Sequence, residues 1–464
     1  MKFHRASRFA FTLALCSLPG VARAQAFGLN EIGSCAVGRA FATTSAPCDD
    51  PSSLFWNPSI LPKDRGLSAL AGAAVISVKG DFTRDTTFQR WDADAPTAVV
   101  PHFFLNYRAA SRLAVGLGAY VPYGLTSQWT DDFPGRFSAK KASLQTIYVQ
   151  PNIAFQISDD WSIGAVPVIG HSTVELIQGA DLSLLATSAA ANAPTFGALG
   201  IARRTEFARA RLKGSAMAYG VNAGVHGRLN QNWEVGARFL SQVYFKYDDA
   251  DATFEQRPTG LTLAANNPLG APAGTPVDAL LASQFTTGAL VAQKVKTRIM
   301  HPAQAQAGFG YTGFENTTVS VDYAWTGWKS FKTLPVQFQG AAASSSRDLL
   351  ENYNNTSSLR VGVEHRLNGG HALRAGIAAA ASAAPDVTVT ALLPEQDRSY
   401  LTLGGKLVLT RSLSLDAAYA HIFTGGRRGR IDERSQASQT ADQLNTGSYT
   451  LRANILSLSL KASL

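Results

Sequence analysis

Few side chains in this chain of 464 residues are arranged as catalysis would require. The eight histidines are scattered, and no serine lies in a context typical of a hydrolase nucleophile. The sequence contains no phosphate-binding loop, no kinase signature and no cysteine–histidine set with the spacing of a metal site. We therefore predict that the protein is not an enzyme and that it holds no cofactor and no metal.

Two cysteines, Cys35 and Cys48, are the residues most able to react with each other. In an oxidising compartment they could close a small loop, which would stabilise the fold by about 3 kcal/mol in the chain-entropy model. Two free thiols are the alternative. The third cysteine, Cys16, follows Leu15, which is bulkier than the residue that usually precedes a lipidated cysteine. We therefore expect no lipid anchor.

The basic run Gly425–Arg430, with the sequence GGRRGR, could bind phosphate groups. The net charge of the chain is +9, and it falls to +5 when the four basic residues before Gln25 are left out. This value is mild for the length and is not typical of nucleic-acid binding. We expect the run either to meet lipopolysaccharide phosphates or to be solvated, and we expect no nucleic-acid partner.

Residues Met1–Ala24 have the three parts of a secretory signal. Basic residues precede the apolar run Phe9–Leu18, and Ala22-Arg23-Ala24 has the small residues of a cleavage site. The apolar run is too short to span a membrane as a helix. The mature chain is therefore expected to begin near Gln25, outside the cytoplasm.

From Leu67 onward, apolar and polar residues alternate with the period of two that is typical of β-strands. Val319, Val321 and Tyr323, for example, would share one face. Most segments are longer than ordinary strands and suit a tilted bilayer crossing. In the last segment the apolar phase changes near Ile455, which predicts a β-bulge. The predicted strands are Leu67–Gly80, Ala98–Ala109, Arg112–Tyr123, Ser143–Ile157, Asp160–Leu176, Arg209–Leu229, Asn232–Tyr247, Lys294–Thr312, Asn316–Phe331, Thr356–Leu367, His371–Ala381, Arg398–Thr410, Arg411–Phe423 and Ser448–Leu464.

The connections between these segments alternate between short turns and long loops. This alternation predicts an all-β fold, a transmembrane 14-stranded antiparallel up-and-down β-barrel in the bacterial outer membrane. Short turns would face the periplasm and long loops the exterior, and an even number of strands would leave both termini on the periplasmic side. A soluble β-sandwich or propeller is the alternative, but such folds rarely alternate turn length so regularly, and no propeller repeat is present.

The two longest loops, 177–208 and 248–293, are richer in apolar residues than ordinary surface loops. We expect short helices in both. Their apolar surface would either capture a ligand above the barrel or pack one loop against the other. The residues that carry this expectation are Leu182, Leu185, Leu261, Leu280 and Phe285.

The segment Gln25–Pro58 contains Cys35 and Cys48 and precedes the first strand. Because both termini are expected at the periplasmic end, this segment can enter the barrel from below as a plug. The predicted organisation is a signal at 1–24, an N-terminal hatch inside the barrel at 25–66 and the barrel itself at 67–464.

Five motifs resemble one family of barrel proteins, and the resemblance covers essentially the whole mature chain. With these motifs the chain resembles the FadL-type outer-membrane transporters of long-chain fatty acids and other hydrophobic compounds, which include outer membrane protein P1 and the toluene transporters. That resemblance implies a barrel plugged by an N-terminal hatch, in agreement with the strand pattern. The motifs are AFGLNEIGSCAVGRAF (Ala26–Phe41), Asn57-Pro58-Ser59, Tyr123-Gly124-Leu125, WTGWKSF (Trp325–Phe331) and LLPEQDRSYLTLGGKL (Leu392–Leu407).

The resemblance also implies a route for a hydrophobic ligand. Capture between the two long loops would be followed by binding inside the barrel beside the hatch, at Phe27 and Leu29. A kink in the third strand at Gly116 and Gly118 would open the wall, and the ligand would leave sideways into the membrane. The hatch and gating residues implied by the resemblance are Gln25, Ala26, Phe27, Asn57 and Pro58.

Two basic residues that hold the carboxylate in fatty-acid members align with Ile177 or Gln178 and with Leu349 here. Arg347 could replace the second, but the first has no basic counterpart. A carboxylate buried without a cationic partner is costly, so we hypothesise a neutral ligand such as an aromatic hydrocarbon. We expect a monomer that contacts outer-membrane lipid and lipopolysaccharide. A water-filled porin and a surface adhesin are the alternatives.

Overall fold

The computed structural model describes residues 26–62, 66–188, 192–265, 267, 269–431, 443 and 445–463. The predicted signal, Gln25 and Leu464 lie outside these residues. Among the described helices, none combines the length and the apolar character that a membrane-spanning helix requires.

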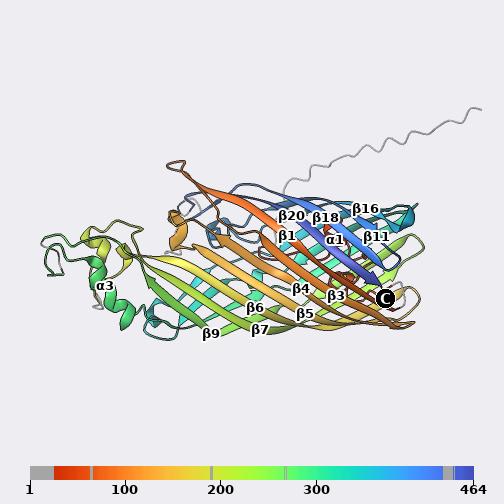
Figure 1. Ribbon diagram of the computed structural model, residues 1–464, viewed down its shortest axis with the longest axis horizontal. Helices are drawn as coiled ribbons and strands as arrows, with labels where there is room; N and C mark the ends of the chain where they lie inside the picture. Colours follow the sequence, from red (N-terminus) through yellow and green to blue (C-terminus); the bar gives the residue numbers. More distant parts are fainter. Residues whose placement is uncertain are drawn as a thin grey trace, which may run out of the picture.

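Fourteen antiparallel strands form a closed barrel, as predicted (Figure 1). Each strand pairs with the next along the chain, and the last pairs with the first through Ser68 and Ser463. The strands are β1 (Gly66–Arg84), β3 (Ala98–Ala110), β4 (Leu113–Gln128), β5 (Lys141–Gln156), β6 (Trp161–Asp181), β7 (Glu206–Arg228), β8 (Trp233–Leu240) continued by β9 (Val243–Gln256), β10 (Gln293–His301) continued by β11 (Gln304–Phe314), β12 (Thr317–Thr326), β15 (Thr356–Arg366), β16 (Ala372–Ala380), β17 (Arg398–Val408), β18 (Leu413–Thr424) and β20 (Gly447–Ser463).

Short turns join the strands at one end of the barrel, and long loops that include α3 project from the other (Figure 1). The predicted single strands at 232–247 and 294–312 are each interrupted, at Ser241–Gln242 and at Pro302–Ala303. Short elements occupy the loops: β2 (Arg90–Asp92), β13 (Thr333–Phe338), β14 (Arg347–Leu350), β19 (Arg427–Gly429), η1 (Pro134–Phe137), η2 (Leu182–Leu184), η3 (Phe196–Leu199), α3 (Val277–Thr286), η4 (Trp328–Ser330), η5 (Ala343–Ser345), η6 (Asn368–Gly370) and η7 (Asp386–Thr388).

The wall is apolar outside and largely polar inside. In β5, Ile147, Val149 and Ile153 are exposed, whereas the intervening Gln150 and Asn152 are buried. A transmembrane barrel requires this arrangement because its outer face contacts lipid.

The bulge predicted near Ile455 is absent, and the register of β20 against β1 runs without a shift from Ser463 to Gly447. The apolar phase changes because the environment of each face changes along the strand. In the lower half of β20, toward the short-turn end, Leu456, Leu458 and Leu460 face outward and are exposed. In the upper half the apolar residues face the lumen, and the outward positions are polar. The change of phase therefore marks the edge of the apolar band and not a defect in the strand.

Residues 26–62, here called the hatch, fill the barrel lumen and contain the two short helices α1 (Ser34–Gly38) and α2 (Ser53–Trp56). Asp49 is the only exposed residue of the hatch. Polar side chains of the wall bind its backbone: Asp322 accepts from the Thr44 N–H at 2.7 Å, and Gln150 donates to the Leu54 carbonyl at 3.1 Å.

A disulfide joins Cys35 and Cys48 within the hatch. The bond closes the loop between α1 and the segment that leads to α2. These two sulfur atoms and Asp50 are the one cluster of possible metal ligands among the described residues. Disulfide sulfurs are not thiolates, so this cluster does not have the donors of a metal site.

A series of wall glycines lets the hatch backbone approach the strands closely. A Cβ atom on Gly236 would lie 2.2 Å from the Thr44 carbonyl oxygen, and one on Gly224 would lie 2.1 Å from Asn57 Oδ1. Contacts shorter than 3 Å with hatch atoms would also arise at Gly116, Gly164, Gly310, Gly362, Gly376 and Gly404. A side chain larger than that of glycine at any of these positions would therefore overlap the hatch.

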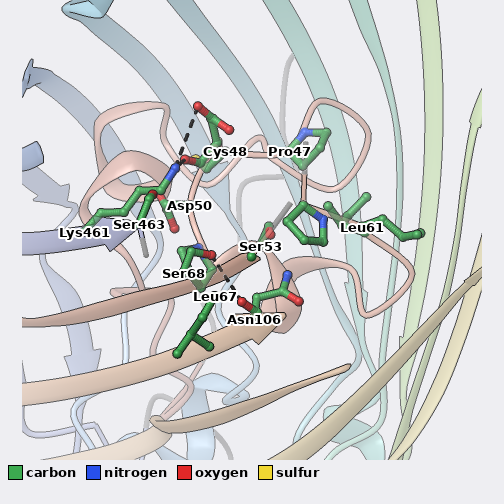
Figure 2. Close-up of a pocket in the computed structure, with 15 residues that line it drawn as sticks. Pro47, Cys48, Asp50, Ser53, Leu61, Leu67, Ser68, Asn106, Lys461 and Ser463 are labelled. Carbon is green, nitrogen blue, oxygen red and sulfur yellow. Dashed lines mark hydrogen bonds and ion pairs between the residues drawn. The ribbon is translucent and has the colours of Figure 1, made fainter. Parts of the chain in front are cut away.

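Residues of the hatch and of the wall together line a pocket at the short-turn end (Figure 2). A cavity of about 60 Å³ lies there between the hatch and β1, with room for a few water molecules. Lys461 of β20 points toward the hatch in Figure 2 and donates to the Asp49 carbonyl at 2.8 Å.

Replacing Gly236 by valine should displace the hatch while leaving the barrel closed. The new side chain would overlap the Thr44 carbonyl, and overpacking of this kind costs about 1–3 kcal/mol. We expect faster proteolysis of the hatch in the variant, with heat-modifiable migration of the barrel retained. Gly425→Val is the control because that position faces open space. Equal protection of the hatch in both variants would contradict the fit described above.

Candidate functional site

The ring of Phe27 lies in an aromatic cluster inside the barrel. Its centroid is 4.6 Å from that of Trp328 and 5.6 Å from that of Phe331, both in edge-to-face geometry. Tyr123 and His301 contact it at 6.1 and 6.0 Å. Contacts of this kind contribute about 0.5–1.5 kcal/mol each beyond the burial of area. The first described turn of the hatch is therefore held by one side chain in an apolar cage.

Backbone hydrogen bonds attach the same residues to β4. The Leu29 N–H donates to the Pro122 carbonyl at 2.9 Å, and the Gly124 N–H donates to the Phe27 carbonyl at 3.0 Å. These bonds form where β4 has separated from β3, since the described pairing of the two strands ends at His102 and Tyr120. Phe27 and Leu29 of the hatch thus form backbone hydrogen bonds with β4 beyond the point where β3 stops pairing with it.

Glu395, in the loop before β17, and Arg398, the first residue of β17, hold the backbone of Ala26. The Ala26 N–H donates to Glu395 Oε1, and Arg398 Nη2 donates to the Ala26 carbonyl at 3.1 Å. Glu395 Oε2 also accepts from the N–H groups of Ala383 and Ala384. Burial raises the pKa of Glu395, although these donors favour its charged form. The carboxylate therefore joins the hatch terminus to the loop 381–397.

An apolar cavity of about 60 Å³ lies beside Phe27. Leu392 and Leu393, from the motif that also contains Glu395, line one side, and Phe331 lines another. The other lining residues come from β4, β5, β6, β10 and the β12–β15 loop: Leu125, Ala142, Ser143, Leu144, Val174, Glu175, Leu176, Ile299, Leu334 and Glu351. The cavity is suited to a small apolar molecule, and Phe27 forms part of its wall.

The charged groups at this cavity are acidic. Glu175 accepts from Lys141 at 2.6 Å and pairs with Arg211 at 2.5 Å, so both nearby cations are already engaged. Glu351 is the second carboxylate of the lining. No cation lines the cavity among the described residues, and a carboxylate ligand would meet carboxylates there.

The irregularity in β4 lies farther along the strand than Gly116 and Gly118, where the resemblance implied a kink. Gly116 and Gly118 stay in regular register with β3 and β5, and the register shift falls between Tyr120 and Tyr123. The two glycines have a packing role instead, because a Cβ on Gly116 would lie 2.7 Å from Leu54 Cδ1 of the hatch. Pro122 lies within the shifted stretch, where a missing N–H suits an interrupted ladder.

The two long loops pack against each other above the barrel. Leu182 and Leu281 are almost fully buried in this contact, whereas Leu280 is 39% exposed. Leu185, Leu261 and Phe285 pack at its edge. In the structure these residues other than Leu280 form a common apolar cluster, and none of them lines the cavity at Phe27.

The remaining predicted residues lie elsewhere. Arg347 is exposed in β14 and donates to Gln178 Oε1 at 3.1 Å, so it does not reach the cavity. Asn57 donates to the Val225 carbonyl at 3.0 Å, and Asn152 donates to the Pro58 carbonyl at 3.1 Å. Asn57 and Pro58 therefore fix the body of the hatch to β7 and β5.

The sequence did not indicate most of the side chains that surround Phe27. Trp328 and Phe331 belong to the motif 325–331, and Leu392, Leu393 and Glu395 to the motif 392–407, but no spacing rule indicated that both motifs meet the hatch. His301, and Tyr148 whose hydroxyl lies 2.9 Å from His301 Nδ1, had no sequence signal, because each is one inward residue of an ordinary alternating strand.

The chain belongs to the family described as outer membrane protein transport protein (OMPP1/FadL/TodX), whose model matches residues 15–463. Members of this family are transporters of the outer membrane, and the protein is accordingly an outer-membrane transport protein. It is 26% identical to the long-chain fatty acid transport protein of Escherichia coli O6:H1 over 425 residues, which are 89% of this chain and 91% of the relative.

Two solved structures share the fold. A FadL homologue of Pseudomonas aeruginosa superposes with a TM-score of 0.75 at 21% identity, over 95% of this chain and 100% of the other. The Pseudomonas putida toluene transporter TodX superposes with a TM-score of 0.64 at 14% identity, over 95% and 99%.

Glu395→Gln should loosen the hatch terminus. A glutamine has one acceptor oxygen and cannot serve both Ala26 and the amides of residues 383 and 384, so a buried donor is left unpaired at about 1–3 kcal/mol. We expect hydrogen exchange of the Ala26 and Leu29 amides to rise at least about fivefold. Glu255→Gln, at a carboxylate 65% exposed, is the control. Unchanged exchange in the Glu395 variant would show that the carboxylate does not hold the terminus.

Proposed function

We propose that this protein takes up small neutral hydrophobic compounds across the outer membrane, with the cavity at Phe27 as the internal binding site. The observation that carries the proposal is the apolar lining of that cavity, closed on one side by a residue of the hatch. Burial of apolar surface contributes about 25 cal/mol per Å² and needs no charged partner. The names of the relatives support two ligand classes, fatty acids and aromatic hydrocarbons.

The acidic residues of the lining favour the neutral class. A fatty-acid carboxylate at this cavity would face Glu175 and Glu351, and burying it unpaired would cost several kcal/mol. Arg347, the one cation that the sequence offered for a carboxylate, is engaged with Gln178 and exposed. An aromatic hydrocarbon would bring no such cost.

We infer that release depends on movement of Ala26–Leu29. These residues are held by few contacts: the Phe27 ring, two backbone bonds to β4 and the contacts with Glu395 and Arg398. The body of the hatch is fixed by its disulfide and by the wall. A ligand that displaces Phe27 would weaken the bonds to β4 at the place where β3 and β4 separate. Lateral exit through that separation into the membrane would keep the ligand away from water.

The alternatives receive less support. A water-filled porin needs an open lumen, whereas the described hatch occupies this one with buried residues. An adhesin would use the long loops and would not need a cavity beside Phe27.

Ligand titrations should separate the two ligand classes. We expect purified protein to bind toluene, with Arg347→Ala having no effect. Leu334→Asn should weaken toluene binding about tenfold, because it buries an amide in the apolar lining at about 1–3 kcal/mol. Tight oleate binding that is lost in Arg347→Ala would overturn the proposal of a neutral ligand.

Deletion of residues 25–30 should change uptake of a hydrophobic substrate. The deletion removes the Phe27 ring and two backbone bonds, each worth about 1 kcal/mol, so the closed hatch should be populated at least about 30-fold less. Radiolabelled toluene uptake by cells is the measurement, with heat-modifiable migration as the test of folding. Unchanged uptake would favour an adhesive role, and a new leak of small polar solutes alone would favour a porin.

A further inference from the structure

Outward-facing side chains mark where the apolar band of the wall ends. On β1 and β20 the last apolar pair toward the long-loop end is Val75 opposite Leu456, and both side chains are exposed. The next outward pair is Ser77 opposite Asn454. The pair after that is Lys79 opposite Arg452, and both are exposed. This cationic pair thus lies just beyond the part of the wall that contacts lipid tails.

Two like charges directly opposite each other on neighbouring strands destabilise a sheet. Neither Lys79 nor Arg452 makes an ion pair or a hydrogen bond through its side chain within the described part of the chain. The acidic residues nearby are already paired, because Arg90 contacts Asp81 at 3.3 Å and Asp92 at 3.1 Å. Lys79 and Arg452 therefore have no anionic partner among the described residues. A bound anion between them would remove their mutual repulsion.

The pair lies in a groove of about 670 Å³ on the barrel at this level. Besides Lys79 and Arg452, the groove is lined by Arg90, His421 and Phe423, and by the carboxylates of Asp81 and Asp92, both of which pair with Arg90. The groove thus offers cations together with an aromatic side chain that is 51% exposed. A ligand with phosphate groups above apolar chains would match both features.

The same arrangement recurs on the opposite side of the barrel. Lys246 of β9 lies opposite Arg298 of β10, and both are exposed. The next pair toward the short-turn end is Tyr244 and Met300. Since β9 and β10 belong to the seventh and eighth strands, whereas β1 and β20 are the first and last, the two cationic pairs lie on opposite sides of the barrel.

We propose that the Lys79–Arg452 groove binds the phosphorylated glucosamine headgroup of lipopolysaccharide in the outer leaflet, with the acyl chains along the apolar wall below it. The proposal rests on the long-loop end facing the exterior, as an outer-membrane transport protein of this topology requires. Phosphate groups bind lysine and arginine through charge-assisted hydrogen bonds, and one phosphate can contact two cations. Lipopolysaccharide fits this position because its phosphates lie at the boundary of the acyl layer.

Binding of lipopolysaccharide to the stripped, full-length protein in detergent tests the proposal. Lys79→Ala/Arg452→Ala should bind about 30-fold more weakly than the unchanged protein, because each cation near an anionic lipid contributes about 1 kcal/mol. Arg112→Ala/Arg411→Ala is the matched control, since it removes two exposed cations at the short-turn end. It should bind as the unchanged protein does. Lys79→Arg/Arg452→Lys keeps both charges and should retain binding.

Three results would overturn the proposal. The first is equal lipopolysaccharide binding by the alanine variant, verified as folded by heat-modifiable migration. The second is equal affinity for lipid A from which both phosphates have been removed. The third is competition by phosphatidylglycerol at the same concentration as lipopolysaccharide, which would identify a general anionic-lipid surface. Toluene binding to the internal cavity should be the same in all variants, so failure here is distinguishable from failure of the proposed transport function.

Discussion

The hatch has almost no secondary structure of its own, so its backbone must find hydrogen-bond partners on the barrel wall. Buried N–H and C=O groups that stay unpaired cost about 1–3 kcal/mol each. The wall meets this demand with inward polar residues such as Asp322, Gln150 and Asn152. Wall glycines such as Gly236 admit the backbone itself. The polar lumen is therefore the complement of one folded segment and is not the lining of an aqueous pore.

The same constraint divides the hatch into two parts. From Ile32 onward it is held by the disulfide, the glycine contacts and many wall hydrogen bonds. Ala26–Leu29 is held by one aromatic ring, by Glu395 and Arg398, and by two backbone hydrogen bonds to β4. Segments with few contacts open at lower free energy than the rest of a fold. The apolar cavity lies against this loosely held part, and it is here that the proposed uptake route couples ligand binding to hatch movement.

The two faces of the wall change character at different heights. Outward residues are apolar only where they meet lipid, and the cationic pairs begin beyond that band. Inward residues are polar around the body of the hatch and aromatic around Phe27, where Tyr123, Tyr148 and Phe245 are buried. One strand therefore carries two independent patterns, and a single apolar period does not describe its whole length. The absence of the predicted bulge at Ile455 follows directly from this.

The sequence alone determined the barrel, because a strand between lipid and lumen must alternate and because turn length alternates with the side of the membrane. It also determined that Gln25–Pro58 lies apart from the strands, and its motifs indicated the family. Only the tertiary structure decided what those motifs contact. Glu395 reaches Ala26 across 369 positions of sequence, and Trp328 reaches Phe27 across a closed lumen. The position of the irregularity in β4 was also decided by the tertiary structure, because beyond the last β3–β4 pair the β4 backbone bonds to Phe27 and Leu29 of the hatch. Local patterns carry no information about partners that barrel closure brings together.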